Sequence, residues 1–116
     1  MEKSDRKEIK ALRQEREKLL QEISSLFLWI RGSYFERFST CSRPNCHCHQ
    51  GQRHGPRAYM VVSEGKRQRQ HYVPRSQEAA AQQAVEQYHR LLDVIARITF
   101  INLELMRRKA LHEDLD

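Results

Sequence analysis

Three cysteines and a histidine lie within fourteen residues, as Cys41, Cys46, Cys48 and His54, and the chain has no other cysteine. Thiolates and imidazoles are common ligands of structural zinc, which four of them surround tetrahedrally, and such short gaps let one loop wrap the ion. The spacing therefore predicts a zinc site. A closed set of four ligands leaves no position for water, so we expect a structural rather than a catalytic metal.

The identity of the fourth ligand is open, because three histidines lie nearby. His47 sits between two cysteines that must both reach the metal, and His49 directly follows Cys48 with little chain to turn back. His54 has five residues of slack before it, and Gly55-Pro56 after it suits a turn that leaves the site. We favour His54 and expect His47 and His49 to be ordinary surface residues.

Disulfides and free thiols are the alternatives to a metal. Three cysteines cannot all pair within one chain, and we recognise neither a signal peptide nor an apolar stretch of membrane length. We therefore expect a cytoplasmic protein with reduced cysteines. Cys48 and His49 have the residue types of a nucleophile pair, but zinc would occupy that thiolate. We find no phosphate-binding loop or hydrolase motif, so we expect no enzyme.

The positive charge is concentrated around the predicted metal loop. Residues 31–75 hold nine of the 21 Lys and Arg residues and only two of the 15 Asp and Glu residues, a net charge of +7 in a chain whose total is +6. The flanks are therefore close to neutral. This localisation predicts a polyanionic partner, and we expect nucleic acid, DNA rather than RNA. The predicted contacts are Arg37, Arg43, Arg53, Arg57, Lys66, Arg67, Arg69, His71 and Arg75.

Two long amphipathic segments flank the basic region. The first, within residues 1–31, runs from about Asp5 to Ile30, with apolar residues at alternating spacings of three and four once Arg16 is admitted as an interruption. The second, within residues 76–111, has Ser76 as its expected N-cap and a tail at 112–116. Asn102 falls on an inward position of its seam, where one polar residue fixes register and strand number. Val85, Leu92, Val94, Ile101 and Met106 add apolar surface outside that seam.

These stripes are wider than one partner helix requires. The simplest arrangement is a monomeric helical hairpin, but the wide stripes and Asn102 favour a homodimer. The predicted dimer seam consists of Leu19, Ile23, Leu26, Ile30, Leu91, Ile95, Ile98, Asn102 and Leu105.

Between the helices, in residues 32–75, the pattern changes to the two-residue period of strands. We expect strands at 33–39, 58–63 and 67–73, with a hairpin turn at 64–66. In the third strand Arg67, Arg69 and His71 then share one face, a cationic ladder suited to a nucleic-acid groove or backbone. Charge that protects an edge strand from aggregation is the competing explanation. The fold class is thus α+β, a single domain with two long helices flanking a small antiparallel sheet and its zinc-binding loop.

Aromatic residues are interleaved with these arginines, a mixture that suits phosphate contacts and base stacking. In so small a sheet, we expect at least half of them to pack against the helices. They are Tyr34, Phe35, Phe38, Tyr59 and Tyr72.

The run from Arg31 to Met106 resembles a group of small, functionally uncharacterised prokaryotic proteins. The shared elements are Gly32-Ser33, the Cys41–Cys48 cluster, His54-Gly55-Pro56, the strand at 58–62 and Tyr72-Val73-Pro74. The group tends to have an aromatic residue directly after His-Gly-Pro, where this chain has Arg57-Ala58. Its members tend to be encoded beside mobile-element genes. A basic sheet beside a zinc loop is also similar in outline to the arm-type DNA-binding domains of some site-specific recombinases.

Two classes of function follow. The first is a zinc-stabilised, homodimeric nucleic-acid-binding protein, for duplex DNA in particular, that assists or regulates a larger recombinase, transposase or nuclease. The second is a protein adaptor whose helices bind a partner while the basic sheet only keeps the surface hydrated. Binding to a nucleic-acid backbone must weaken steeply with salt, which separates the two.

We predict that the centre of the chain folds only with metal. Residues 39–57 offer little apolar surface, so metal binding must supply much of the local folding free energy. Elemental analysis should find one zinc ion per chain, and Cys41→Ser should lower both zinc content and stability. A correctly folded, metal-free protein would contradict the prediction, and a fully loaded, stable Cys41→Ser variant would move the site elsewhere.

Overall fold

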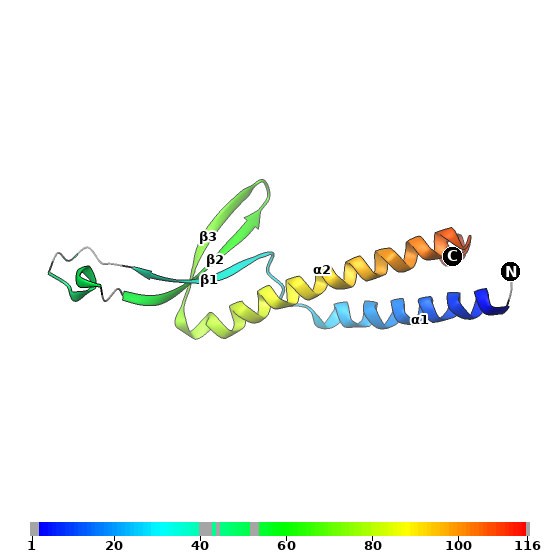
Figure 1. Cartoon of the computed structure of the whole chain (residues 1–116), viewed down its shortest axis with the longest axis horizontal. Helices are drawn as coiled ribbons and strands as arrows, with labels where there is room; N and C mark the ends of the chain where they lie inside the picture. Colours follow the sequence, from blue (N-terminus) through cyan, green and yellow to red (C-terminus); the bar gives the residue numbers. More distant parts are fainter. Residues whose placement is uncertain (1–2, 40–42, 44, 52–53, 116) are drawn as a thin grey trace. The chain divides into compact units, whose positions relative to one another are not determined.

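The computed structural model describes residues 3–39, 43, 45–51 and 54–115. Its elements are α1 (Lys3–Ser25), β1 (Gly32–Ser39), η1 (His47–Gln50), β2 (His54–Glu64), β3 (Arg67–Val73), η2 (Arg75–Gln77), α2 (Glu78–Arg107) and η3 (Leu111–Leu115) (Figure 1). The predicted class is confirmed: two long helices accompany a three-stranded antiparallel sheet in the order β1-β2-β3. No helix in the described part of the chain has the length and hydrophobicity needed to cross a bilayer.

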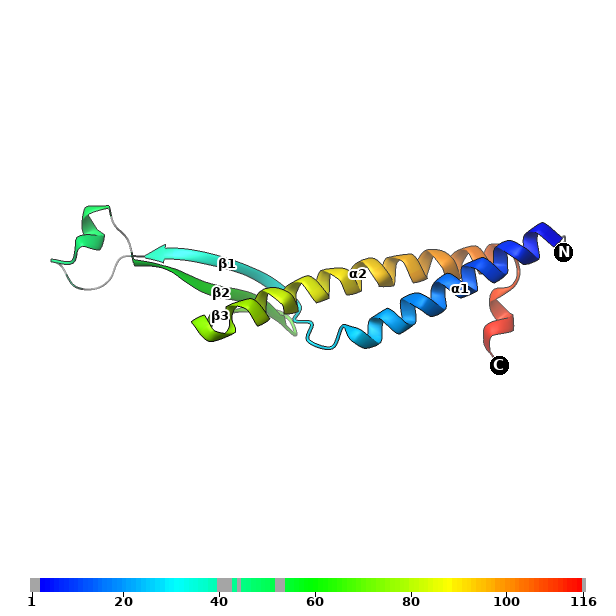
Figure 2. The same cartoon turned by 90° about the horizontal axis from the view of Figure 1, so that it is seen from below.

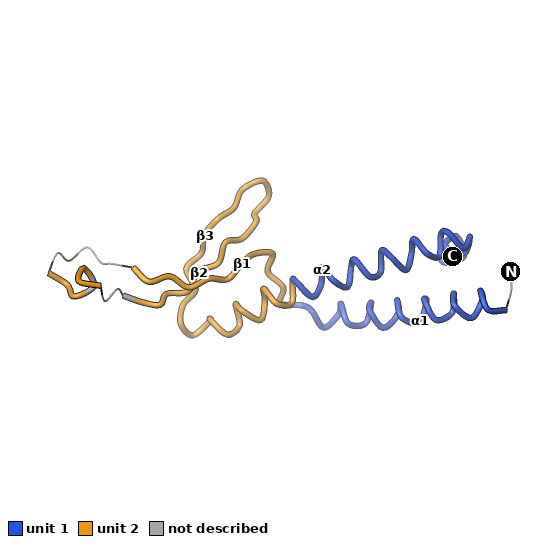
Figure 3. Tube along the Cα trace, viewed as in Figure 1, with its two compact units in different colours: residues 1–27, 89–116 blue, residues 28–88 orange. Residues whose placement is uncertain are grey.

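Contacts within the chain group into two compact units, residues 1–27 with 89–116, and residues 28–88 (Figure 3). The first is a helical hairpin and the second holds the sheet. Helix α2 contributes to both, because its first turns belong to the sheet unit and the rest to the hairpin.

In the hairpin unit, α1 runs antiparallel to the later part of α2, as Figures 1 and 2 both show. Ile9, Ile101, Leu105 and Ala110 are buried together, with Leu12, Leu19 and Leu111 packed around them. Val94 and Ile101 are fully buried, whereas Ile95 is 47% exposed. Within the single chain, α2 therefore packs through Val94 and Ile101, which the sequence analysis placed outside the seam, while Ile95 of the predicted dimer seam is left exposed.

Two arginines of α2, and Arg108 just after its end, form ion pairs with acidic residues of α1. Arg90 Nη2 donates to Glu22 Oε1 at 2.7 Å, and Arg97 Nη2 donates to Glu15 Oε1 at 2.8 Å. The two glutamates are seven residues apart on α1, and the two arginines are seven residues apart on α2. The two ion pairs are therefore separated by two helical turns, and together they fix the antiparallel register. Arg108 adds a further pair with Asp5.

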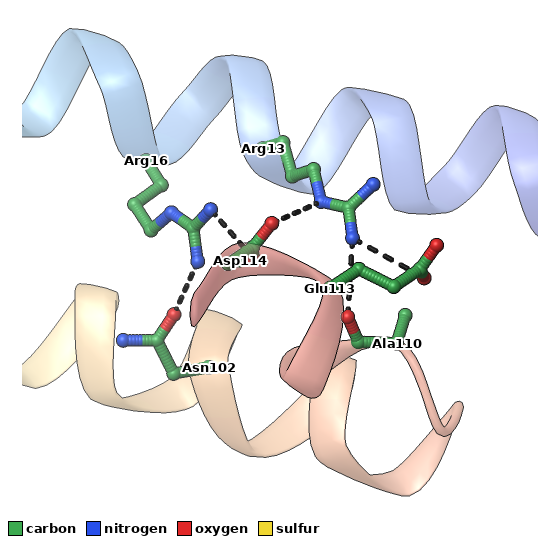
Figure 4. A network of polar contacts seen from close by, with 6 residues as sticks. All are labelled: Arg13, Arg16, Asn102, Ala110, Glu113 and Asp114. Atoms are coloured by element: carbon green, nitrogen blue, oxygen red, sulfur yellow. Dashed lines mark hydrogen bonds and ion pairs between the residues drawn. The ribbon is translucent and has the colours of Figure 1, made fainter. Parts of the chain in front are cut away.

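The two polar residues that interrupt the apolar seams meet in space. Arg16 Nη1 donates to Asn102 Oδ1 at 2.7 Å, and Arg16 Nη2 donates to Asp114 Oδ2 at 2.8 Å (Figure 4). Arg13 Nη2 donates to the carbonyl oxygen of Ala110 at 3.1 Å. Asn102 thus satisfies a partly buried arginine of its own chain. The expected tail, through Asp114, belongs to this network as part of η3.

Both helices are shorter than the sequence predicted. The hydroxyls of Ser24 and Ser25 donate to the carbonyl oxygens of Gln21 and Glu22 at 2.6 and 2.7 Å, competing with the helix for its last carbonyls, and α1 stops at Ser25 rather than near Ile30. Helix α2 begins at Glu78, after η2, and not at Ser76. It stops at Arg107 rather than near Leu111, because Lys109 takes a left-handed φ of 59°.

In the sheet unit, β1 and β3 match the expected spans to within one residue, but β2 begins at His54, four residues earlier than predicted. Gly55-Pro56 therefore lies within a strand and not in a turn. Two residues, Gly65 and Lys66, form the β2–β3 turn, and Gly65 has a φ of 63° that suits glycine.

We predict that the charge pairs of the hairpin make its stability pH-dependent. Hydrogen bonds from Arg97 and Arg90 lower the pKa values of Glu15 and Glu22 below their ordinary 4.5. The stabilisation is therefore complete above pH 4.5 and is lost as pH falls through the lowered pKa values. Urea denaturation at pH 7 and pH 3 should show a smaller difference for the double variant Glu15→Gln/Glu22→Gln than for the parent.

Glu17→Gln, at an exposed position of the same helix, is the matched control and should keep the parental pH dependence. Equal pH dependence of the parent and the double variant would show that the pairs contribute nothing to folding.

Candidate nucleic-acid interface

Strand pairing decides which face of the sheet each side chain occupies, because residues directly opposite one another share a face. Tyr34 pairs with Met60, and Ala58 pairs with Val73. These four pack with Ala81 of α2 in the core of the sheet unit. We call this side of the sheet the helix-side face. Burial of Tyr34 there, with the nearby negative charges of Glu78 and Glu36, raises the pKa of its phenol.

The opposite side carries a row of three aromatic rings, one from each strand, and we call it the aromatic face. Phe35 pairs with Tyr59, which pairs with Tyr72. The ring centroids of Phe35 and Tyr59 lie 5.7 Å apart at an interplanar angle of 23°, and those of Tyr59 and Tyr72 lie 5.8 Å apart at 68°. Tyr72, on the edge strand, is 59% exposed. The rings therefore form a continuous band across the sheet.

Two arginines flank this row. Arg37 and Arg57 pair with each other one position beyond Phe35 and Tyr59 on the same face, and both are exposed. The Arg37 guanidinium carbon lies 5.4 Å from the centroids of both the Phe35 and the Tyr59 ring. At these distances the cation interacts with the π-faces of the rings.

The carboxylates of the sheet lie on one face. Glu36 and Glu64, the two carboxylates of residues 31–75, pair with Ala58 and Arg67 and so lie on the helix-side face. Among the paired residues of the aromatic face that the structure describes there is no acidic side chain. That face combines cationic and aromatic groups without an acidic side chain of its own to compete for them.

The predicted ladder of Arg67, Arg69 and His71 lies on the helix-side face. Its members share one face, as the strand alternation required, and all three are exposed. Glu64 Oε2 lies 3.1 Å from His71 Nε2 and 3.9 Å from Arg69 Nε, so a carboxylate offsets part of the charge of the ladder.

The expectation that at least half of the aromatic residues pack against the helices was wrong. Of the five, only Tyr34 joins the core of the sheet unit described here, while Phe38 is 55% exposed. The reason is that the core face of so small a sheet is already filled by Ala58, Met60 and Val73.

A polar hollow of about 310 Å³ borders the aromatic row at Tyr72. Arg57 and Arg75 line it with Glu78, the first residue of α2. Its two guanidinium-bearing residues outnumber its one carboxylate, so the hollow suits an anion.

The predicted metal ligands fall largely outside the described residues. Cys41 lies outside them altogether, as do the side chains of Cys48 and His54. The described side chains include no group of three His, Cys, Asp or Glu residues that could hold a metal. The zinc site therefore stays a prediction.

The backbone around the cluster is partly described. His49 N donates to the Cys46 carbonyl oxygen at 3.1 Å, and Cys46 N donates to the Arg43 carbonyl oxygen at 3.2 Å, so two tight turns follow one another. Cys46 Sγ lies 3.9 Å from His47 Nδ1. Ser39 pairs with His54, which closes the loop by joining the end of β1 to the start of β2.

The remaining predicted nucleic-acid contacts do not gather on one surface. Lys66 is exposed in the β2–β3 turn, and Arg43 is exposed in the loop before η1. Arg53 lies outside the described residues.

The cluster of Phe35, Arg37, Arg57 and Tyr59 was not predicted from the sequence. The sequence does contain a signal for it, because each of two strands has an aromatic residue and an arginine two positions apart, Phe35 with Arg37 and Tyr59 with Arg57. Recognising the cluster also requires the register in which these two strands pair.

The comparison with known families places this chain. A model of DUF6788, a domain of unknown function, matches residues 7–84. The chain belongs to the DUF6788 family. The match covers most of α1, the loop, the sheet and the first turns of α2. This agrees with the resemblance to an uncharacterised family. No curated protein and no solved structure matches the chain.

In this DUF6788 protein, Gly55 lies where the β1–β2 ladder leaves the loop, and we predict that it tolerates no side chain. Its φ is 135°, and a Cβ atom there would meet the Arg37 carbonyl oxygen at 2.9 Å. Gly55→Ala should therefore lower the free energy of unfolding by about 1–3 kcal/mol, from backbone strain and displacement of β1. Thermal denaturation would measure it.

Gly51→Ala is the matched control, since Gly51 also has a positive φ, of 101°, but a Cβ atom there meets nothing within 4 Å. It should cost less, because strain alone is involved. Equal losses for the two variants would mean that the contact with β1 is unimportant.

Proposed function

We propose that this DUF6788 protein is a zinc-stabilised, homodimeric nucleic-acid-binding protein with an accessory or regulatory role in a mobile element or a recombinase or nuclease system. Its role is binding rather than catalysis. The observation that carries the proposal is that the carboxylates of the sheet lie on the helix-side face alone. Arg37 and Arg57 flank a row of aromatic rings on a face whose described residues include no carboxylate.

This arrangement fits nucleic acid better than a hydrated surface. A sheet face that serves only hydration needs charge but has no use for aromatic rings, which are costly to expose. Arginine binds phosphate through a planar fork, and aromatic rings stack on bases. The cationic ladder was the surface that the sequence analysis matched to a nucleic-acid groove or backbone. That ladder shares its face with both carboxylates of the region, so the aromatic face is the better candidate.

Zinc supports this function by closing the loop beside the same two strands. The donor set of Cys41, Cys46, Cys48 and His54 fits the ion chemically, since three thiolates and one imidazole form a closed set. Bound there, zinc would supply folding energy that a loop of polar residues lacks.

We predict that binding depends on Arg37 and Arg57. Replacing both with alanine should weaken binding of any nucleic acid and lower the slope of log K against log salt by about 1.4 for single strands and about 1.8 for duplex, because two phosphate contacts are lost. Fluorescence anisotropy with labelled oligonucleotides over a range of salt concentrations measures both quantities.

Lys7→Ala/Lys10→Ala on α1 is the charge-matched control and should leave the slope unchanged. The variant Arg67→Ala/Arg69→Ala tests the helix-side face in the same way. A larger loss of affinity in that variant would show that the cationic ladder, and not the aromatic face, binds nucleic acid. Binding that does not change with salt in any variant would favour the protein adaptor instead.

The proposed dimer uses apolar surface that the hairpin leaves uncovered. Leu92, Ile95, Leu103 and Met106 of α2 are each 43–52% exposed and lie at helical spacing along one side. Of the predicted seam, Leu105 is fully buried within its own chain, so this uncovered stripe is the better contact for a second copy. Identical stripes on two copies can pair about a two-fold axis.

We predict that Ile95→Glu/Leu103→Glu abolishes the dimer, because each partner would bury charge against an apolar stripe. Sedimentation equilibrium should give twice the mass of one chain for the parent and the mass of one chain for the variant. Leu20→Glu, an equally exposed apolar position on α1 (47%), should remain dimeric. A parent that sediments as a monomer at high concentration would rule out the dimer.

A further inference from the structure

We infer that the aromatic face binds single-stranded nucleic acid, with bases stacked along Phe35, Tyr59 and Tyr72 and the backbone held by Arg57 and Arg75. This inference rests on the proposed nucleic-acid-binding function and specifies its substrate. It changes the expected substrate from a duplex to a single strand.

The aromatic row is built for stacking. Its three rings come from directly opposed positions on adjacent strands, so the sheet holds them at fixed separations of 5.7 and 5.8 Å between centroids. Base–aromatic stacking tolerates any sequence, because every base has a π-face. The row can therefore accept successive unpaired bases without reading their edges.

Arg37 covers part of the row without being fixed there. Its guanidinium lies 5.4 Å from two ring centroids, and its Nη2 donates to Gln70 Oε1 over a long 3.4 Å. Gln70 and Arg37 are both exposed. An incoming base can replace the guanidinium on the rings or stack on its plane, and the displaced cation stays close enough to meet a phosphate.

The polar hollow lies beside Tyr72 of the aromatic row, where the sugar-phosphate backbone of a bound strand would continue past the rings. Tyr72 belongs to both features, and Arg57 lines the hollow while sharing the face of the row. A phosphate held by Arg57 and Arg75 would lie near Glu78, the one carboxylate that lines the hollow. One strand can thus place a base on Tyr72 and its phosphate in the hollow.

A duplex cannot use the row. Its bases are stacked inside the double helix, so only their edges and the backbone are accessible to a sheet. Phosphate contacts would bind both forms, whereas stacking adds affinity for the single strand alone. The geometry therefore makes the ring residues determinants of selectivity and the arginines determinants of affinity.

The test compares labelled dodecamers of deoxythymidine and uridine with a 12-base-pair duplex, by fluorescence anisotropy. Tyr72→Leu should weaken binding of single strands by about 5- to 160-fold, the effect of losing one stacked base, and leave duplex binding unchanged. Tyr72→Phe keeps the ring and should bind as the parent does. Phe27→Leu removes an aromatic residue that is 77% exposed but lies outside the sheet, and should change nothing. Comparing the two dodecamers separates DNA from RNA.

A second measurement uses the unaltered chain. Dodecamers containing 5-iodouracil should crosslink on irradiation to Tyr59 or Tyr72, mapped by mass spectrometry of the peptides. This inference would be overturned if all three oligonucleotides bound without a preference for the single strand, Tyr72→Leu bound as the parent does, and the crosslinks mapped elsewhere. The proposed function would remain supported in that case. If none of the oligonucleotides binds at any salt concentration, both are wrong.

Discussion

The register of β2 between its two neighbours is the constraint on which the rest of the sheet unit depends. Side chains alternate along a strand, so a slip of one residue would move every side chain of β2 to the other face. In the observed register Ala58 and Met60 join the core while Arg57 and Tyr59 lie on the opposite side. The small Ala58, 1% exposed, allows close packing against α2. The same alternation that fills the core thus assembles the aromatic row and places the acidic residues on the other face.

The helical hairpin follows a different rule, in which charge pairs set the register and apolar residues supply most of the stability. Exposed ion pairs are each worth about 0–1 kcal/mol, too little to drive the association of two long helices. The buried Ile9, Val94, Ile101 and Leu105 supply the larger hydrophobic contribution. Glu15 and Glu22 meet Arg97 and Arg90 only in one alignment, however, so they select it. The meeting of Arg16 with Asn102 has the same effect.

Element types and the β2–β3 hairpin could be predicted from the sequence, but the β1–β2 register and the buried faces could not. The helices, the three strands and the Gly65-Lys66 turn follow from local periodicity and turn chemistry, which are encoded within a few residues. The ends of the helices were harder to predict, because the hydroxyls of two adjacent serines donate hydrogen bonds to backbone carbonyl oxygens in the last turn of α1. The sequence located Arg67, Arg69 and His71 on a common face, but which face is buried depends on how β2 and α2 pack together, and the alternation within β3 does not specify this. The cluster of Phe35 with Tyr59 depended on the register between β1 and β2, and the face of α2 that is buried within the chain depended on its pairing with α1.

The predicted zinc loop and the aromatic face share one ladder, and this links their properties. Along β1 and β2 the pair Ser39–His54 comes first, Arg37–Arg57 follows, and Phe35–Tyr59 comes next, with a bulge between Arg37 and Ser39. A bulge interrupts the hydrogen bonds, so this end of the ladder depends on what holds the loop closed. If His54 binds zinc together with the cysteines, the metal clamps the ladder one pair away from Arg37. Removal of such a metal would free the strand ends, and it would affect the Arg37–Arg57 pair before the Phe35–Tyr59 pair, because the first of these lies nearer the loop.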